Sequence, residues 1–168
     1  NGELVRAADE NLVFAIDLVG SSDDDLFSID CSQGPPIPVG GIHITGGGEQ
    51  STDGDALAMD GGSFSQVTHV FTDASSGSVT IESNAPIEYS GLEPITDGLL
   101  AQDRVFEFAS SDDEITIGDD GNLTNGFSRI ASTDSSETVD FEVAPGGRVT
   151  VRTGAGDDQV TASDLDPT

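Results

Sequence analysis

The sequence VTVRTGAGDDQVTASD, residues 149–164, contains two short stretches of β-forming residues joined by a turn rich in glycine and aspartate. Alternation of apolar and polar side chains on either side of the turn predicts two short β-strands. Gly154 and Gly156 permit a backbone that is too tight for a Cβ atom. Asp157 and Asp158 follow directly, so a carboxylate can point at a cation held between stacked turns. The stretch therefore predicts a strand–turn–strand unit that is built to stack on similar units.

Looser copies of this turn occur upstream, as SSDDDLF (21–27), SSDDEIT (110–116) and the weaker TDSSETV (133–139). The last three copies keep one step, because Asp112, Asp134 and Asp157 follow one another at intervals of 22 and 23 residues. The apolar residues before the turns keep a similar step, and they are Phe108, Ile130 and Val151. A repeat of this length predicts a right-handed parallel β-helix, or β-solenoid, with coils of about 22 residues.

The rest of the chain fits the same class. Runs such as LVFAID (12–17), IHIT (42–45) and VTIES (79–83) alternate like strands, and glycine, proline or aspartate separates them. No stretch keeps helical spacing, so we expect an all-β chain. The alternative is a β-sandwich of the cadherin or immunoglobulin type, which also has short strands and acidic loops. The regular step favours the solenoid, and we expect residues 1–168 to form a single repeat module cut from a longer repetitive protein.

Charge restricts the partners. The chain carries 32 acidic and 5 basic residues, for a net charge of −27, and all of the basic residues are arginines. Such a surface repels nucleic acid and anionic lipid, and it also repels itself, so we expect the chain to be most compact in salt or with bound cations. No apolar run approaches the length needed to cross a membrane. These features predict an acidic, halotolerant protein with neither a nucleic-acid partner nor membrane insertion.

The segment TGAGDDQVTASDLD (153–166) resembles the hemolysin-type, or RTX-like, repeats of large secreted bacterial proteins. The resemblance implies secretion, a β-solenoid and folding that calcium assists. It covers about the last 80 residues. RTX turns recur every nine residues and share each calcium between neighbours, whereas the step in this chain is 22 to 23 residues. Isolated calcium sites are therefore expected in place of a continuous array of ions.

Stacked turns would gather carboxylates that calcium prefers as ligands. One candidate column contains Asp112, Asp134 and Asp157, with Asp113 and Asp158 beside it. Asp23 and Asp24, next to Asp25, form a second candidate, and Asp53 with Asp55 a third. The alternative is that these aspartates cap turns through backbone hydrogen bonds and are otherwise solvated.

Catalysis is not expected. His43 and His69 alternate with apolar neighbours and are interpreted as outward-facing or satisfied histidines, and the single Cys31 as a small buried residue. The sequence therefore predicts a non-catalytic structural or adhesive module at the cell surface or outside the cell. Its expected partners are calcium ions, neighbouring repeat modules, and surface glycans or matrix. A glycan-binding module is the first alternative, with Tyr89 as its one obvious aromatic residue, and a polysaccharide-degrading β-helix enzyme is the second.

Overall fold

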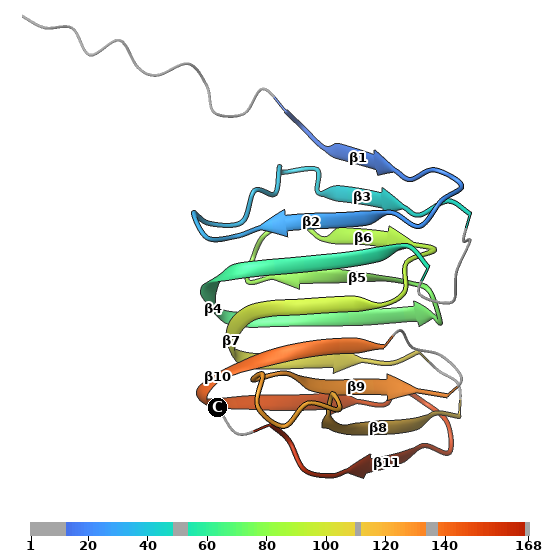
Figure 1. Cartoon of the computed structure of the whole chain (residues 1–168), viewed down its shortest axis with the longest axis vertical. Helices are drawn as coiled ribbons and strands as arrows, with labels where there is room; N and C mark the ends of the chain where they lie inside the picture. The colour runs from blue at the N-terminus through green and yellow to red at the C-terminus, as the bar shows by residue number, and fades with distance from the viewer. Residues whose placement is uncertain (1–12, 49–53, 110–111, 134–137, 167–168) are drawn as a thin grey trace, which may run out of the picture.

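The computed structural model describes residues 13–48, 54–109, 112–133 and 138–166, and within these ranges the chain forms β-strands and no helix (Figure 1). The strands are β1 (Ile16–Val19), β2 (Leu26–Asp30), β3 (Ile42–Thr45), β4 (Ala56–Asp73), β5 (Ser76–Ile81), β6 (Ile87–Ser90), β7 (Ile95–Glu107), β8 (Glu114–Asp119), β9 (Ser128–Ser132), β10 (Val139–Arg152) and β11 (Gln159–Ala162). The expected all-β class is confirmed. None of the described segments is a helix long and apolar enough to span a membrane.

All of these strands belong to one mixed sheet that does not close on itself. Its order is β1-β3-β6-β5-β4-β7-β10-β9-β8-β11, and β2 pairs with β4 outside this path. The pairs β4–β7 and β7–β10 at its centre are parallel, and so are β1–β3, β3–β6, β2–β4 and β8–β11. The cadherin and immunoglobulin sandwiches pack two antiparallel sheets, so this parallel centre differs from that alternative.

Three long strands, β4, β7 and β10, bend sharply at the same side of the molecule (Figure 1). Glycines lie at the bends because the backbone there leaves the ordinary strand conformation. Gly61 and Gly62 both have φ of 79° in β4, and Gly146 has φ of 76° in β10. The β4–β7 ladder breaks between Asp60 and Ser63 and then resumes, so each half of a long strand pairs with the matching half of the next.

The core lies between these half-strands. In the first halves Leu57, Ile95 and Val139 stand in register, and all three are buried. In the second halves Phe106 lies between His69 and Val151 in the ladder, and its ring is 5.0 Å from that of Phe141, centroid to centroid. Burial of such stacked apolar side chains is the main favourable contribution to folding.

The expected coil of about 22 residues is wrong for the described strands. Parallel partners late in the chain are 45 residues apart, as Ile115 with Val160 and Phe106 with Val151 show. The intermediate copy does not form a parallel coil, because β9 pairs antiparallel with both β8 and β10. The sequence step was therefore half of the true spacing between stacked strands. An antiparallel hairpin repeats the apolar pattern as well as a parallel coil does.

Exposed apolar side chains gather at the two ends of the stack. Phe14, Val19 and Leu26 are 73%, 77% and 69% exposed in or beside β1 and β2. At the other end, all four residues of β11 are exposed, including Val160. Among the described residues β1 pairs only with β3 and β2 only with β4 at one end, and β11 pairs only with β8 at the other, so both ends present unpaired strand edges.

Candidate functional site: the acidic edge

The acidic turns lie together at one edge of the stack, opposite the bends of the long strands (Figure 1). This edge holds the connections from β1 to β2, from β6 to β7 and from β10 to β11, together with the described parts of those from β3 to β4 and from β7 to β8. Neighbouring turns are tied by their backbones: Gly20 N donates to Thr45 O at 2.8 Å, and Gly46 N donates to Ser90 O at 2.9 Å. The turns approach so closely that a Cβ atom on Gly46 would lie 2.0 Å from Gly91 O. Glycine is therefore required where these turns stack.

Asp55 is the centre of the upper part of this edge. It is fully buried, and its Oδ1 accepts a hydrogen bond of 2.7 Å from Asp25 N, in the preceding turn. Its own carbonyl oxygen accepts from Glu93 N at 2.6 Å, in the following turn. The side-chain Oδ2 is buried and has no hydrogen-bond partner among the described residues. A buried anionic oxygen in this state is costly unless a cation or a proton donor compensates it.

Oxygen atoms converge around Asp55. A Cβ atom built on Gly46 would lie 2.6 Å from Asp55 Oδ2 as well as close to Gly91 O, and one built on Gly20 would lie near Gly46 O and Asp25 Oδ2. This edge therefore offers both carboxylate and backbone carbonyl oxygens, the ligand types that calcium uses. Among the described residues no group of three or more His, Cys, Asp or Glu side chains is placed to hold a metal. A calcium ion here would have to take several ligands from the backbone.

The lower part of the edge contains four of the predicted metal ligands, and they join two turns directly. Asp157 N donates to Asp112 Oδ1 at 2.9 Å, and Asp113 N donates to Asp158 Oδ1 at 3.0 Å. Ser132 Oγ adds a hydrogen bond of 3.1 Å to Asp113 Oδ1. The expected stacking of Asp112 on Asp157 is therefore found, with one carboxylate oxygen of each pair capping the backbone of the neighbouring turn.

Two of the other predicted ligands, Asp134 and Asp53, lie outside the described residues. Asp23 and Asp24 are exposed in the turn between β1 and β2, and Asp23 N donates to Ser21 Oγ at 3.1 Å within that turn. Asp55, which the sequence groups with Asp53 as a further candidate, is fully buried, whereas Asp23 and Asp24 are exposed.

A buried ionic cluster in the interior was not expected. His69, Asp97 and Arg104 have fully buried side chains, and Asp97 Oδ2 contacts His69 Nε2 at 2.7 Å and also accepts from Arg104 Nη1. Leu99 N donates to Asp97 Oδ1 at 3.0 Å, and Arg104 Nε donates to Glu142 O at 3.1 Å. Alternation in DRVFEF (103–108) places Arg104 on the same strand face as Phe106. This alternation is the sequence pattern that indicates a buried Arg104.

The cluster sets the protonation of its members. Burial alone would raise the pKa of Asp97, but Arg104, His69 and the Leu99 amide outweigh burial and hold this pKa below its ordinary value. Burial lowers the pKa of His69, and the Asp97 carboxylate offsets this only in part. His69 is therefore neutral, with Nε2–H donating to Asp97. Its Nδ1 is buried without a hydrogen-bond partner among the described residues, so a proton there would be unsatisfied.

We expect His69 to make the fold sensitive to mild acid. Its pKa is lowered in the folded state, so protons bind the unfolded chain more tightly, and stability is lost as pH falls below the unfolded value of about 6.5. Between pH 7 and 5 the wild type should lose up to about 2 kcal/mol more than His69→Gln, which keeps a donor but cannot titrate. Urea unfolding at the two pH values measures the difference. Equal pH dependence in the wild type and in His69→Gln would contradict this role.

Cys31 and Tyr89 are both buried. Burial raises the pKa of the Cys31 thiol to about 11, with Asp97 and Asp30 adding to the effect, so the thiolate form is disfavoured at neutral pH. The expectation that Cys31 is a small buried residue is confirmed. Tyr89 is 4% exposed, so the aromatic residue proposed to stack on sugars faces the interior.

No protein family, curated protein or solved structure matches this sequence. The chain is therefore classified by its structure alone, as an all-β protein with a mixed, open sheet and stacked acidic turns along one edge.

Proposed function

We propose that this chain is a non-catalytic structural module of the β-solenoid type, belonging to a secreted or cell-surface protein. One observation carries the proposal: β4, β7 and β10 keep parallel register on both sides of their bends, as the successive coils of a solenoid do. Such a stack is extended and rigid, and its length grows with each added strand, which suits a spacer or an adhesive stalk.

The ends of the stack support the same proposal. Natural proteins usually protect a sheet edge with charge, proline or a covering segment, because an open edge pairs with other strands. Here Val19 and Leu26 at one end and Val160 at the other are exposed beside unpaired edges. Neighbouring repeat modules of the same protein would cover these residues and continue the sheet.

Calcium is the proposed stabilising ligand, and the buried Asp55 is its proposed anchor. Asp55 Oδ2 supplies one anionic ligand, and carbonyl oxygens such as Gly91 O and the nearby Asp25 carboxylate could complete the shell. The pairs Asp112–Asp157 and Asp113–Asp158 already use carboxylate oxygens on backbone amides, so they stabilise the lower turns even without a cation.

Calorimetric titration with calcium tests this assignment. We expect the wild type to bind calcium more tightly than magnesium, because magnesium demands a stricter octahedral shell and releases water reluctantly. Asp55→Asn should weaken binding about tenfold or more, since an anionic ligand is lost. Asp103→Asn removes an equal charge from an exposed side chain and should bind like the wild type. Equal calcium affinity in Asp55→Asn and Asp103→Asn would contradict the site.

The glycan-binding and polysaccharide-degrading alternatives make different predictions. A glycan array and a polysaccharide-cleavage assay on the wild-type chain should both be negative for a purely structural module. A carbohydrate hit that survives EDTA would favour the glycan-binding function, and release of oligosaccharides would favour the enzyme.

A further inference from the structure

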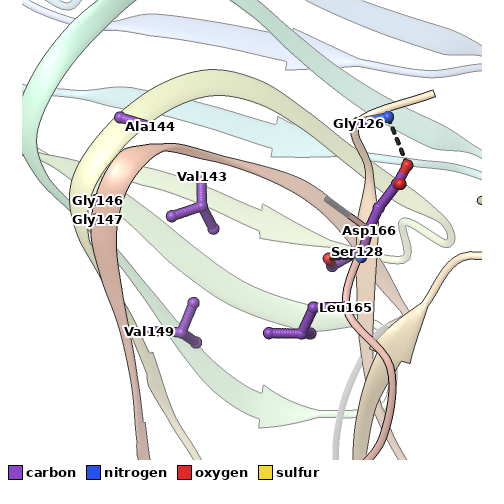
Figure 2. A pocket seen from close by; sticks show the side chains of 9 residues that line it. All are labelled: Gly126, Ser128, Val143, Ala144, Gly146, Gly147, Val149, Leu165 and Asp166. Atoms are coloured by element: carbon purple, nitrogen blue, oxygen red, sulfur yellow. Dashed lines mark hydrogen bonds between the residues drawn. The ribbon is translucent and has the colours of Figure 1, made fainter. Parts of the chain in front are cut away.

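A cleft lies beside the bend of β10 (Figure 2). The bend of β10 is on the side of the molecule away from the acidic edge (Figure 1). It has a volume of about 370 Å³, which falls in the range of pockets that hold small ligands. Val143, Val149 and Leu165 form an apolar wall, and their side chains point into the cleft in Figure 2. The backbone of Gly146 and Gly147 closes the side at the bend.

Of the side chains that the structure describes, Asp166 is the one charged group that lines this cleft. It is 6% exposed, and its position is fixed at two points: Oδ2 accepts from Gly126 N at 2.6 Å, and its backbone N donates to Ser128 Oγ at 3.2 Å. The second carboxylate oxygen, Oδ1, is buried and has no hydrogen-bond partner among the described residues. In Figure 2 the Asp166 carboxylate points toward Gly126, across the cleft from Val143 and Val149. A buried carboxylate oxygen without a partner can accept a hydrogen bond from a ligand that brings its own donor.

The charged residues around the cleft determine whether it favours a cationic or an anionic ligand. Asp119 is the cross-strand partner of Ser128, so both side chains lie on one face of the sheet, and Asp119 Oδ2 is also buried without a hydrogen-bond partner in the described structure. Arg129 follows the lining residue Ser128, so its side chain projects from the opposite strand face, where it pairs with Asp140. Arg148 precedes the lining residue Val149 and in the same way projects from the opposite face, where it pairs with Asp103. None of the arginines that the structure describes lines the cleft. The site therefore attracts cations and repels anions.

We propose that this cleft binds an aliphatic primary ammonium group, with the ammonium donating to Asp166 Oδ1 and the alkyl chain lying on Val143, Val149 and Leu165. A hard divalent metal fits less well, because it needs six or more oxygen ligands and the apolar wall supplies none. An alkyl chain with an ammonium end matches both halves of the cleft, as lysine side chains do when their stems cover apolar surface.

A titration of the isotope-labelled chain, followed by amide NMR, tests the proposal. The probe is n-pentylammonium, with 1-pentanol and pentanoate as neutral and anionic analogues, all at the same high ionic strength to suppress loose binding to the acidic surface. We expect pentylammonium to shift the amide signals of Gly126, Gly146 and Gly147. Pentanol should bind about tenfold or more weakly than pentylammonium, because it cannot form the charge-assisted hydrogen bond. Pentanoate should not bind.

Variants separate this site from general attraction of cations. Asp166→Asn should reduce pentylammonium affinity about tenfold or more, and Val143→Phe should fill the cleft and abolish binding. Glu93→Gln removes an exposed charge at the distant acidic edge and should leave affinity unchanged. If Asp166→Asn fails to fold, the probe series on the wild type and the Val143→Phe variant still decide. Equal binding of pentylammonium and pentanol, unchanged affinity in Val143→Phe, or no shift of the three glycine signals would overturn the proposal.

Discussion

Arg104→Met should destabilise the fold by about 3–5 kcal/mol, the usual cost of leaving one member of a buried ion pair without its partner. The substitution keeps the apolar volume of the side chain but leaves the Asp97 carboxylate fully buried with only His69 Nε2 and Leu99 N as hydrogen-bond donors. For a chain of this size the loss corresponds to a fall in melting temperature of roughly 10 °C. Chemical denaturation at neutral pH measures the change.

Arg129→Met provides the matched control, because it breaks another Arg–Asp contact whose arginine is 43% exposed. Solvent screens such a pair, and we expect a loss below about 1 kcal/mol. A triple variant, Asp97→Leu, Arg104→Met and His69→Phe, should regain much of the stability lost in Arg104→Met, since no charge then remains buried at this cluster. Equal losses in Arg104→Met and Arg129→Met would show that the interior cluster does not stabilise the fold.

Gly46→Ala should also destabilise strongly, by roughly 1–3 kcal/mol or more, because the acidic edge has no room for a methyl group at this position. The added Cβ atom would lie 2.0 Å from Gly91 O and 2.6 Å from Asp55 Oδ2, so two neighbouring turns would have to separate. The hydrogen bond from Gly46 N to Ser90 O would be strained by the same movement. Thermal unfolding without added metal isolates this effect from cation binding.

Gly48→Ala is the control for Gly46→Ala, two residues away in the same turn. The described atom nearest to a Cβ atom on Gly48 would be Ser22 Cα at 3.6 Å, an ordinary contact, and Gly48 is exposed. Its substitution should change the free energy of unfolding by less than about 0.5 kcal/mol. A Gly46→Ala variant as stable as Gly48→Ala would mean that the turns are not stacked as closely as the fold requires.

The sequence predicted the strands and the acidic edge through local patterns. Alternating residues marked most strand positions, and the spacing of Asp112 and Asp157 identified two turns that do stack. Period alone could not give the direction of pairing, because the apolar residues of an antiparallel hairpin recur in the same way as those of a parallel coil. Because β9 pairs antiparallel between β8 and β10, the parallel partners are separated by two sequence steps and not by one.

Long-range contacts explain the remaining differences. The importance of Asp55 depends on two other turns, around Asp25 and Glu93, that are far from it in sequence. The burial of Asp97 likewise depends on Arg104 across the bend of β7 and on His69 from β4. A single aspartate in a segment such as EPITDG (93–98) looks like a solvated turn residue until its partners are known.

The central claim is that calcium bound at the acidic edge stabilises the stacked turns. The most direct test is the melting temperature of the wild-type chain in calcium, in magnesium and in EDTA at one fixed ionic strength. Monovalent salt should stabilise the chain by screening its net charge of −27, and that effect is the same in all three solutions. At a hundredfold excess over Kd, a calcium ion bound only by the folded state adds about 2.7 kcal/mol, or roughly 5 to 10 °C for a chain of this length. We predict this rise in calcium alone, and its loss in Asp55→Asn. Equal melting temperatures in calcium, magnesium and EDTA would contradict the account.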